Sequence, residues 1–378
     1  MRSNRSGPVT AVAKFPAKKG RAFAIQALCC ILLGCLPYCA EATQCKDRAP
    51  SVAHALTAEM QQEGIIGLSA AIALKGTLCW ERGFGFADIE NAVPATSRTM
   101  YRLASITKPI TATAIMQLVE AGKIDLDVPI QRYLTEYPVQ RWPVTVRQLL
   151  GHLAGVRHYR PGEENSTQHY RNVIEPLNIF MHDPLESEPG VAFLYTTYGY
   201  DVLGAIVQVV SGQAFLDFLR FNIFSPAKMK FIRDDDSLAI IPRRTRGYQR
   251  GPDGHLLNSG LADTSNKVPA GGLIGTPQDL IRFALAWQRG GLISEATCRL
   301  MSISQVTRTG QRTNYGLGWY VDTREGRRLI YHTGHQQGTK TLLAILPDQQ
   351  AVVAIMANSE NADQFRLLDA VVKALRLR

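Results

Sequence analysis

A serine and a lysine three residues apart, Ser105 and Lys108, form the first pair in this chain whose spacing suits covalent chemistry. Residues at positions i and i+3 share one helix face, so the hydroxyl and the amine can meet within a single turn. A serine hydroxyl is a weak nucleophile that needs a base, and a lysine is such a base only when burial or nearby cations lower its pKa. Residues 105–121 are almost entirely apolar after their first turn, which predicts a buried helix and therefore this environment.

The Ser-x-x-Lys pattern is weak evidence by itself. Ser225 and Lys228 match it too, although that copy contains Pro226 and ends a helical segment instead of opening one. The alternative for Ser105 is a helix cap beside an exposed Lys108, because serine is a favoured N-cap residue. Other motifs in the chain are needed to distinguish a catalytic pair from a helix cap.

Two further segments supply such groups. Tyr195 and Thr197 directly precede a helical segment at residues 198–211, and His332 to Gly334 end a strand-like segment near the C-terminus. The chain has no Gly-x-Ser-x-Gly elbow, so the α/β-hydrolase alternative loses its main sign.

No metal or other cofactor is predicted. The chain has no Cys-x-x-Cys, no His-Glu-x-x-His and no close His/Cys cluster. His152 and His158 lie six residues apart without a third ligand at a suitable spacing, so we expect them to be structural.

With its three motifs in this order, the sequence resembles the serine β-lactamases and DD-peptidases of the class C type, from about Leu68 to the C-terminus. The separations of 90 residues from Ser105 to Tyr195 and 227 residues to His332 are of the expected size. Longer phrases resemble the mitochondrial serine β-lactamase-like branch of that family: Tyr101–Lys108, Val146–Tyr159 and Phe193–Tyr200.

The resemblance implies an acyl-enzyme mechanism. Ser105 would attack a carbonyl group, while Lys108 and Tyr195 would move its proton. The backbone N–H groups of Ser105 and His335 would form the oxyanion hole, where negative charge develops in the transition state. The residues implied in substrate binding are Thr197, His332, Thr333 and Gly334.

Two positions depart from the family pattern. Thr197 stands where many relatives carry Asn, so an amide that could contact the acyl group is missing. His332 stands where β-lactamases usually carry Lys, and a histidine is only partly charged at neutral pH, which predicts weaker, pH-dependent carboxylate binding. Both departures favour a peptidase or esterase over an efficient β-lactamase. The alternative function is a catalytically weak binding or scaffold protein on the same fold.

The elements that must position these residues are strands at both ends of the chain and helices between them. Residues 68–74 and 77–87 predict a hairpin, and residues 328–333, 339–346 and 351–357 predict further strands before a closing helix. We therefore expect an α+β fold of the β-lactamase/transpeptidase type. Its antiparallel sheet would come from about 43–100 plus 270–378, and a mostly helical subdomain from about 101–269.

The N-terminus reads as a signal peptide over residues 1–42. Six basic residues precede residue 22, an uncharged run covers residues 22–36, and Ala40-Glu41-Ala42 is a small-x-small cleavage pattern. The run is short for a membrane span. The alternatives are an uncleaved anchor and a lipid attached at Cys35. We expect a secreted or periplasmic protein, at the membrane only in those two cases.

The charge of the chain is concentrated in that leader. The formal charge of +10 falls to +5 when residues 1–42 are removed, since 36 basic and 31 acidic residues remain. The basic residues are scattered, so nucleic acid is not an expected partner, whereas a small molecule or a peptide is. Cys45, Cys79 and Cys298 remain after residue 42. The sequence allows a disulfide between Cys45 and Cys79 but does not decide whether it forms. The oligomeric state is left open as well.

Overall fold

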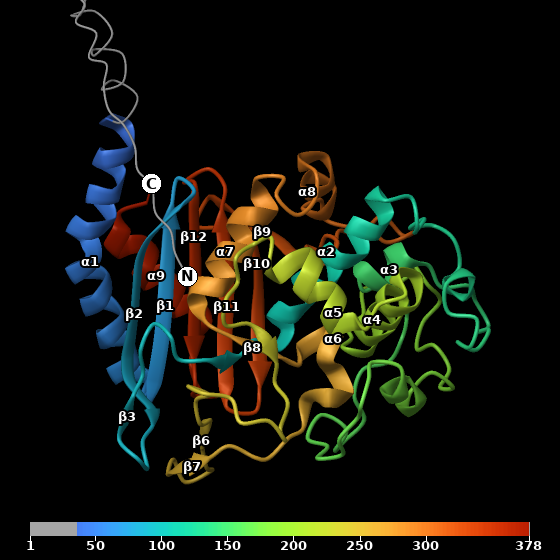
Figure 1. Cartoon of the computed structure of the whole chain (residues 1–378), viewed down its shortest axis with the longest axis horizontal. Coiled ribbons are helices and arrows are strands. Elements are labelled where there is room, and N and C mark those ends of the chain that lie inside the picture. Colours follow the sequence, from blue (N-terminus) through green and yellow to red (C-terminus); the bar gives the residue numbers. More distant parts are fainter. Residues whose placement is uncertain (1–35, 378) are drawn as a thin grey trace, which may run out of the picture. The chain divides into compact units, whose positions relative to one another are not determined.

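An antiparallel sheet made from both ends of the chain is the main feature of the computed structural model, which describes residues 36–377 (Figure 1). In the described part it has seven strands. In order across the sheet they are β3 (Val93–Pro94), β2 (Thr77–Asp88), β1 (Gly67–Leu74), β12 (Ala351–Ala357), β11 (Thr339–Leu346), β10 (Arg327–Gln336) and β9 (Tyr320–Arg324). Strand β1 pairs with β12, with Leu68 opposite Ala357, so the predicted union of the two chain ends is confirmed.

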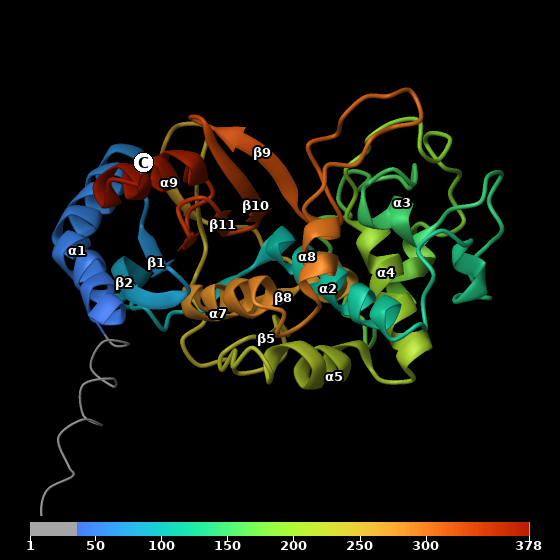
Figure 2. The same ribbon diagram turned by 90° about the horizontal axis from the view of Figure 1, so that it is seen from above.

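Different helices cover the two faces of the sheet (Figure 2). Successive residues of a strand point to opposite faces. Leu342 and Ala344 of β11 therefore pack in one apolar cluster with α1 (Leu36–Glu63) and α9 (Gln364–Leu375). Leu343 and Ile345 pack in the larger cluster that includes the other helices.

The segment between the terminal strands is mostly helical. Its helices are α2 (Thr107–Glu120), α3 (Val146–Leu150), α4 (Tyr198–Ser211), α5 (Phe215–Leu219), α6 (Val268–Gly271), α7 (Pro277–Gln288) and α8 (Glu295–Met301). Short helical turns are η1 (Ala104–Ile106), η2 (Ile130–Arg132), η3 (Glu175–Ile179), η4 (Arg220–Phe224) and η5 (Thr264–Lys267). Small sheets join β4 (Tyr101–Arg102), β8 (Leu273–Gly275) and β5 (Arg233–Asp234), and β6 (Tyr248–Arg250) with β7 (Leu256–Asn258).

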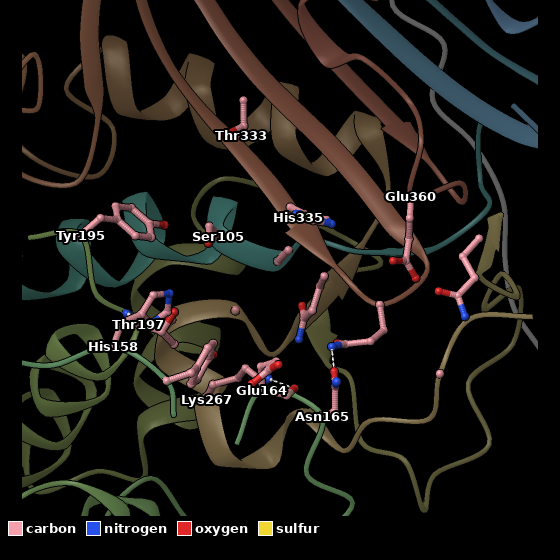
Figure 3. A pocket seen from close by; sticks show the side chains of 18 of the residues that line it. Ser105, His158, Glu164, Asn165, Tyr195, Thr197, Lys267, Thr333, His335 and Glu360 are labelled. Carbon is pink, nitrogen blue, oxygen red and sulfur yellow. Dashed lines mark hydrogen bonds between the residues drawn. The ribbon is translucent and has the colours of Figure 1, made fainter. Parts of the chain in front are cut away.

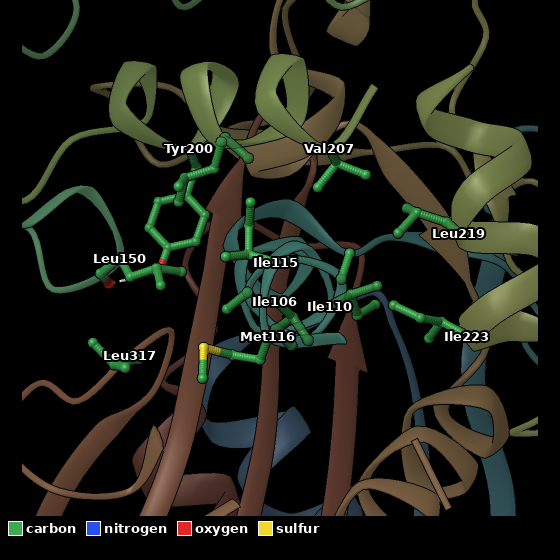
Figure 4. Packing of buried hydrophobic residues seen from close by; sticks show 14 of the residues in the cluster. Ile106, Ile110, Ile115, Met116, Leu150, Tyr200, Val207, Leu219, Ile223 and Leu317 are labelled. Atoms are coloured by element: carbon green, nitrogen blue, oxygen red, sulfur yellow. Dashed lines mark hydrogen bonds between the residues drawn. The ribbon is translucent and has the colours of Figure 1, made fainter. Parts of the chain in front are cut away.

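Helix α2 is the central, buried helix that the sequence predicts. Eleven of its fourteen residues are buried. Figure 4 shows it end-on, with Ile110, Ile115 and Met116 facing side chains from neighbouring elements, among them Tyr200 and Val207 of α4. Only its start differs from the prediction, because Ser105 lies in the 3₁₀ turn η1 and the α-helix begins at Thr107.

Local signals set the ends of several helices as predicted. Thr145 and Thr276 each form a capping box, with Gln148 and Asp279 respectively, at the starts of α3 and α7. Gly212 ends α4 with a φ of +70°, a left-handed conformation that glycine adopts without steric cost.

Two sequence expectations concern the N-terminal part of the chain. A disulfide joins Cys45 of α1 to Cys79 of β2, and Cys298 is free and buried. Most of the expected signal peptide, including Cys35, lies outside the described residues. Residues 41–378 form one unit, and the expected boundaries of a sheet part and a helical part remain a prediction.

Candidate active site

Ser105 and Lys108 meet at the start of the buried helix. The Lys108 Nζ atom lies 3.0 Å from Ser105 Oγ and 3.0 Å from the carbonyl oxygen of Ala270 in α6. The lysine side chain is fully buried. Ala104, just before the serine, has a φ of +49°, a conformation that a non-glycine residue rarely adopts and that recurs at functional sites. Ser105 is therefore not a cap beside an exposed lysine.

The environment of Lys108 favours its neutral form. Burial lowers the pKa of its amine to about 7, and the nearby Lys267 cation acts in the same direction, against an opposing contribution from Asp201. A neutral amine has a lone pair that can accept the proton of a hydroxyl group. The pair therefore has both the distance and the protonation state that a serine nucleophile and its base require.

The phenol of Tyr195 completes the polar cluster. Tyr195 lines the cavity together with Ser105, and Lys108 Nζ lies 4.9 Å from the centre of the Tyr195 ring. Burial raises the pKa of this phenol well above its usual range, against a smaller lowering effect of the Ser105 side chain. Tyr195 therefore keeps its proton at neutral pH and is suited to donate it. The His152 ring lies 4.3 Å from the Tyr195 ring and supports its position.

A cavity of about 690 Å³ opens over Ser105 (Figure 3). Tyr195, Thr197, Thr333 and His335 line it together with the serine. The last residues of β10 border this cavity because β9 stops pairing with β10 at Tyr331, whereas β11 pairs as far as Gln336. A substrate carbonyl placed here would face a strand edge as well as the nucleophile.

A family comparison agrees with this geometry. The model of the beta-lactamase family matches residues 52–378. The chain belongs to the beta-lactamase family. The predicted family resemblance and the predicted fold are both confirmed, and membership identifies the chain as a serine hydrolase in the general sense.

Curated proteins and solved structures of this beta-lactamase family are similar along most of the chain. The human serine beta-lactamase-like protein LACTB, mitochondrial, is 28% identical, covering 81% of this chain and 74% of its own length. Penicillin-binding protein 4* of Bacillus subtilis is 26% identical, covering 79% of this chain and 69% of its own. A D-amino acid amidase from Ochrobactrum anthropi, complexed with D-phenylalanine, has the same fold, with a TM-score of 0.76 and 23% identity over 87% of this chain and 99% of its own.

His332 does not line the cavity, although its motif predicts a role in substrate binding. It is 1% exposed, and its Nδ1 atom contacts the Thr333 carbonyl oxygen at 2.7 Å. A carbonyl only accepts, so Nδ1 carries the proton and Nε2 accepts from the Tyr315 hydroxyl at 3.0 Å. Burial, followed by the charge of Lys108, lowers the imidazole pKa to about 3. The expected pH-dependent carboxylate binding by His332 is therefore wrong, because the ring is neutral and enclosed.

Gly334 also has a structural role instead of the expected one in substrate binding. It is buried, and a Cβ atom at this position would overlap the Thr341 hydroxyl and the Leu103 carbonyl oxygen and lie 3.1 Å from the Cβ of Ala104. A residue without a side chain lets β10 press against the segment that carries the nucleophile. Thr197, Thr333 and His335, by contrast, all reach the cavity.

Sequence reasoning missed three groups close to the nucleophile. Lys267 lines the cavity and is 3% exposed. Asp201 is 1% exposed, and neither of its carboxyl oxygens has a hydrogen-bond partner within the described structure. His158, expected to be only structural, also lines the cavity, and burial lowers its pKa to about 4. A lysine inside the apolar Val-Pro-Ala-Gly-Gly context of residues 267–272 was the one available signal.

Proposed function

We propose that this chain hydrolyses an amide or ester bond through an acyl-enzyme on Ser105. The observation that carries the proposal is the 3.0 Å contact between the Ser105 hydroxyl and a fully buried lysine amine whose pKa is about 7. In the first step, Ser105 Oγ bonds to the substrate carbonyl carbon while its proton passes to neutral Lys108. The carbonyl oxygen becomes negatively charged and is stabilised by the backbone N–H groups of Ser105 and His335.

The second step expels the leaving group. The bond from the carbonyl carbon to the leaving nitrogen or oxygen breaks, and that atom takes a proton from the Tyr195 hydroxyl. The Lys108 ammonium then returns the proton to Tyr195, which restores both groups. The raised pKa of Tyr195 favours this donor role over a role as the initial base. Water attacks the ester on Ser105 by the same route in reverse and releases the acyl group.

A peptidase or esterase is a better match to the site than an efficient β-lactamase. His332 is neutral and enclosed, so the β10 side of the cavity has Thr333 and His335 but no permanent cation. Thr197 offers a hydroxyl group without an amide. The amidase named among the similar structures is a reason to include D-amino-acid amides in a substrate screen.

Covalent labelling tests the nucleophile and its base. The protein is incubated with a serine-directed phosphonate, and intact mass is measured over time for the unmodified chain, Ser105→Ala and Lys108→Ala. We expect a single adduct that disappears in Ser105→Ala and forms at least about 100-fold more slowly in Lys108→Ala. A folded protein that never forms an adduct would support the scaffold alternative, and unchanged labelling in Lys108→Ala would exclude this lysine as the base.

The bond that is cleaved requires a turnover screen. We propose comparing p-nitrophenyl esters, D-amino-acid amides and peptides, and a chromogenic cephalosporin under the same conditions. The proposal expects an ester or amide to have the highest kcat/KM. A cephalosporin turned over faster than all of them would contradict the peptidase or esterase assignment.

We also propose that the mature protein is secreted or periplasmic. The basic and apolar leader supports this, and a disulfide such as Cys45–Cys79 persists in oxidising compartments. Within residues 36–377 no single helix is long and apolar enough to cross a membrane. N-terminal sequencing and a lipid analysis of the purified protein distinguish cleavage after residue 42, lipidation at Cys35 and an intact leader.

A further inference from the structure

Lys267 is a buried cation on the wall of the catalytic cavity. Its side chain is 3% exposed, yet it belongs to the residues that line the cavity over Ser105. In Figure 3, Thr333 and His335 lie on one side of Ser105, whereas Thr197, His158 and Lys267 lie on the other. The lysine is therefore placed where a substrate bound at Ser105 would extend away from β10.

The protein only partly satisfies this ammonium group. Its Nζ atom donates one hydrogen bond, to the carbonyl oxygen of Glu164 at 2.7 Å, and lies 5.0 Å from the centre of the Tyr159 ring. Among the described residues no carboxylate oxygen lies within ion-pair distance of it. A lysine ammonium has three protons to donate, and a buried charge is costly unless a counter-charge accompanies it. The site has donors and positive charge left for a ligand.

The buried carboxyl group of Asp201 forms no ion pair with Lys267 in the described structure. Asp201 has no hydrogen-bond partner for either oxygen in the described structure, and burial raises the pKa of its carboxyl well above the usual range, which favours the uncharged form. Burial lowers the pKa of Lys267 to about 8, against raising contributions from the carboxyl groups of Asp201 and, more weakly, Glu164. Glu164 also lines the cavity. Lys267 is therefore mostly charged at pH 7.

Lys267 is the one lysine or arginine among the described residues that line this cavity. Among the lining residues in the described part of the chain, the only other basic side chains are His158, whose pKa is about 4, and His335, whose pKa burial also lowers. We propose that Lys267 is the anion-binding residue of the site and that the substrates carry a carboxylate that pairs with it. This inference deepens the proposed hydrolase function and rests on it. A single ammonium with one occupied donor matches a monoanion, which is why we assign a carboxylate.

A matched pair of inhibitors tests the proposal. Two phosphonates that label Ser105 and differ only in a terminal carboxylate or carboxamide on the acyl side are compared by their second-order labelling rates, with intact mass as the readout. We expect the unmodified protein to prefer the carboxylate at least about tenfold, the size expected of a charged hydrogen bond. Lys267→Gln should lose that preference. Lys123→Gln, which changes an exposed lysine outside the cavity lining, should keep it.

The outcomes separate this inference from the proposed function. Labelling of Ser105 by both inhibitors at equal rates in the unmodified protein would overturn the role of Lys267 and leave the nucleophile intact. A preference that survives in Lys267→Gln would overturn it as well. If neither inhibitor labels Ser105, the proposed function fails. The anion site is then tested separately by calorimetry, which measures the dissociation constant of the carboxylate inhibitor for Ser105→Ala and for Ser105→Ala/Lys267→Gln. Equal dissociation constants in those two variants would overturn it.

Discussion

The Tyr315 hydroxyl donates a hydrogen bond to Nε2 of His332 across 3.0 Å, in a region where both side chains are buried. This contact holds the histidine of the His-Thr-Gly motif away from the cavity and in one tautomer. The motif therefore contributes to the site through Thr333 and the backbone after it, and the histidine contributes to the core.

Tyr315→Phe should destabilise the fold while leaving catalysis nearly unchanged. Removing the hydroxyl leaves a buried imidazole nitrogen without its donor, which costs about 1–3 kcal/mol. Urea unfolding measures the loss. Tyr331→Phe is a matched control, because the Tyr331 hydroxyl makes no hydrogen bond in the described structure and should change stability by less. Slower labelling of Ser105 under conditions in which Tyr315→Phe remains folded would show that His332 acts in catalysis.

The rate of acylation should rise with pH through about 7. The pKa of Lys108 is about 7, and only the neutral amine accepts the serine proton, so activity is low below that value and reaches a plateau above it. The pH profile of phosphonate labelling measures the inflection. In Lys267→Gln the inflection should move to higher pH, because the Lys267 charge lowers the pKa of Lys108. A profile that is flat between pH 5 and 9 would contradict the role of Lys108.

Asp201→Asn should make the protein more stable at neutral pH and have little effect near pH 4. Burial raises the pKa of Asp201 in the folded protein, so unfolding releases its proton, and stability falls as pH rises above the unfolded value of about 4. Asparagine does not titrate and removes this dependence. Thermal unfolding of both proteins at pH 4 and pH 7.5 tests the difference. If the substitution changes stability equally at pH 4 and pH 7.5, the pKa of Asp201 is not raised in the folded protein.

Gly334→Ala should reduce both stability and acylation. The added methyl group would overlap the Leu103 carbonyl and the Thr341 hydroxyl, and relief of that overlap moves the segment that holds Ser105. We expect a stability loss of about 1–3 kcal/mol, typical of overpacking, together with slower labelling. Gly260→Ala is the stability control, since a Cβ atom there meets nothing within 4 Å. Wild-type stability in Gly334→Ala would show that the strand can shift freely.

Much of the fold follows from local patterns in the sequence. The hairpin of β1 and β2, strands β11 and β12, and helix α4 coincide with the predicted segments to within a residue, because alternation, helical spacing and capping residues act over a few positions. The pairing of Ser105 with Lys108 is equally local, since one helical turn brings the two side chains together.

The tertiary structure decided what each distant residue faces. His332 is enclosed because Tyr315, from the segment before β9, packs against its ring, and no spacing along the chain indicates that contact. Lys267 borders the cavity because η5 and α6 pass beneath the start of α2, where Ala270 accepts from Lys108. Burial and charge at these positions depend on elements from several parts of the chain. The sequence therefore determined which groups could react, and packing determined which of them are charged, neutral or within reach.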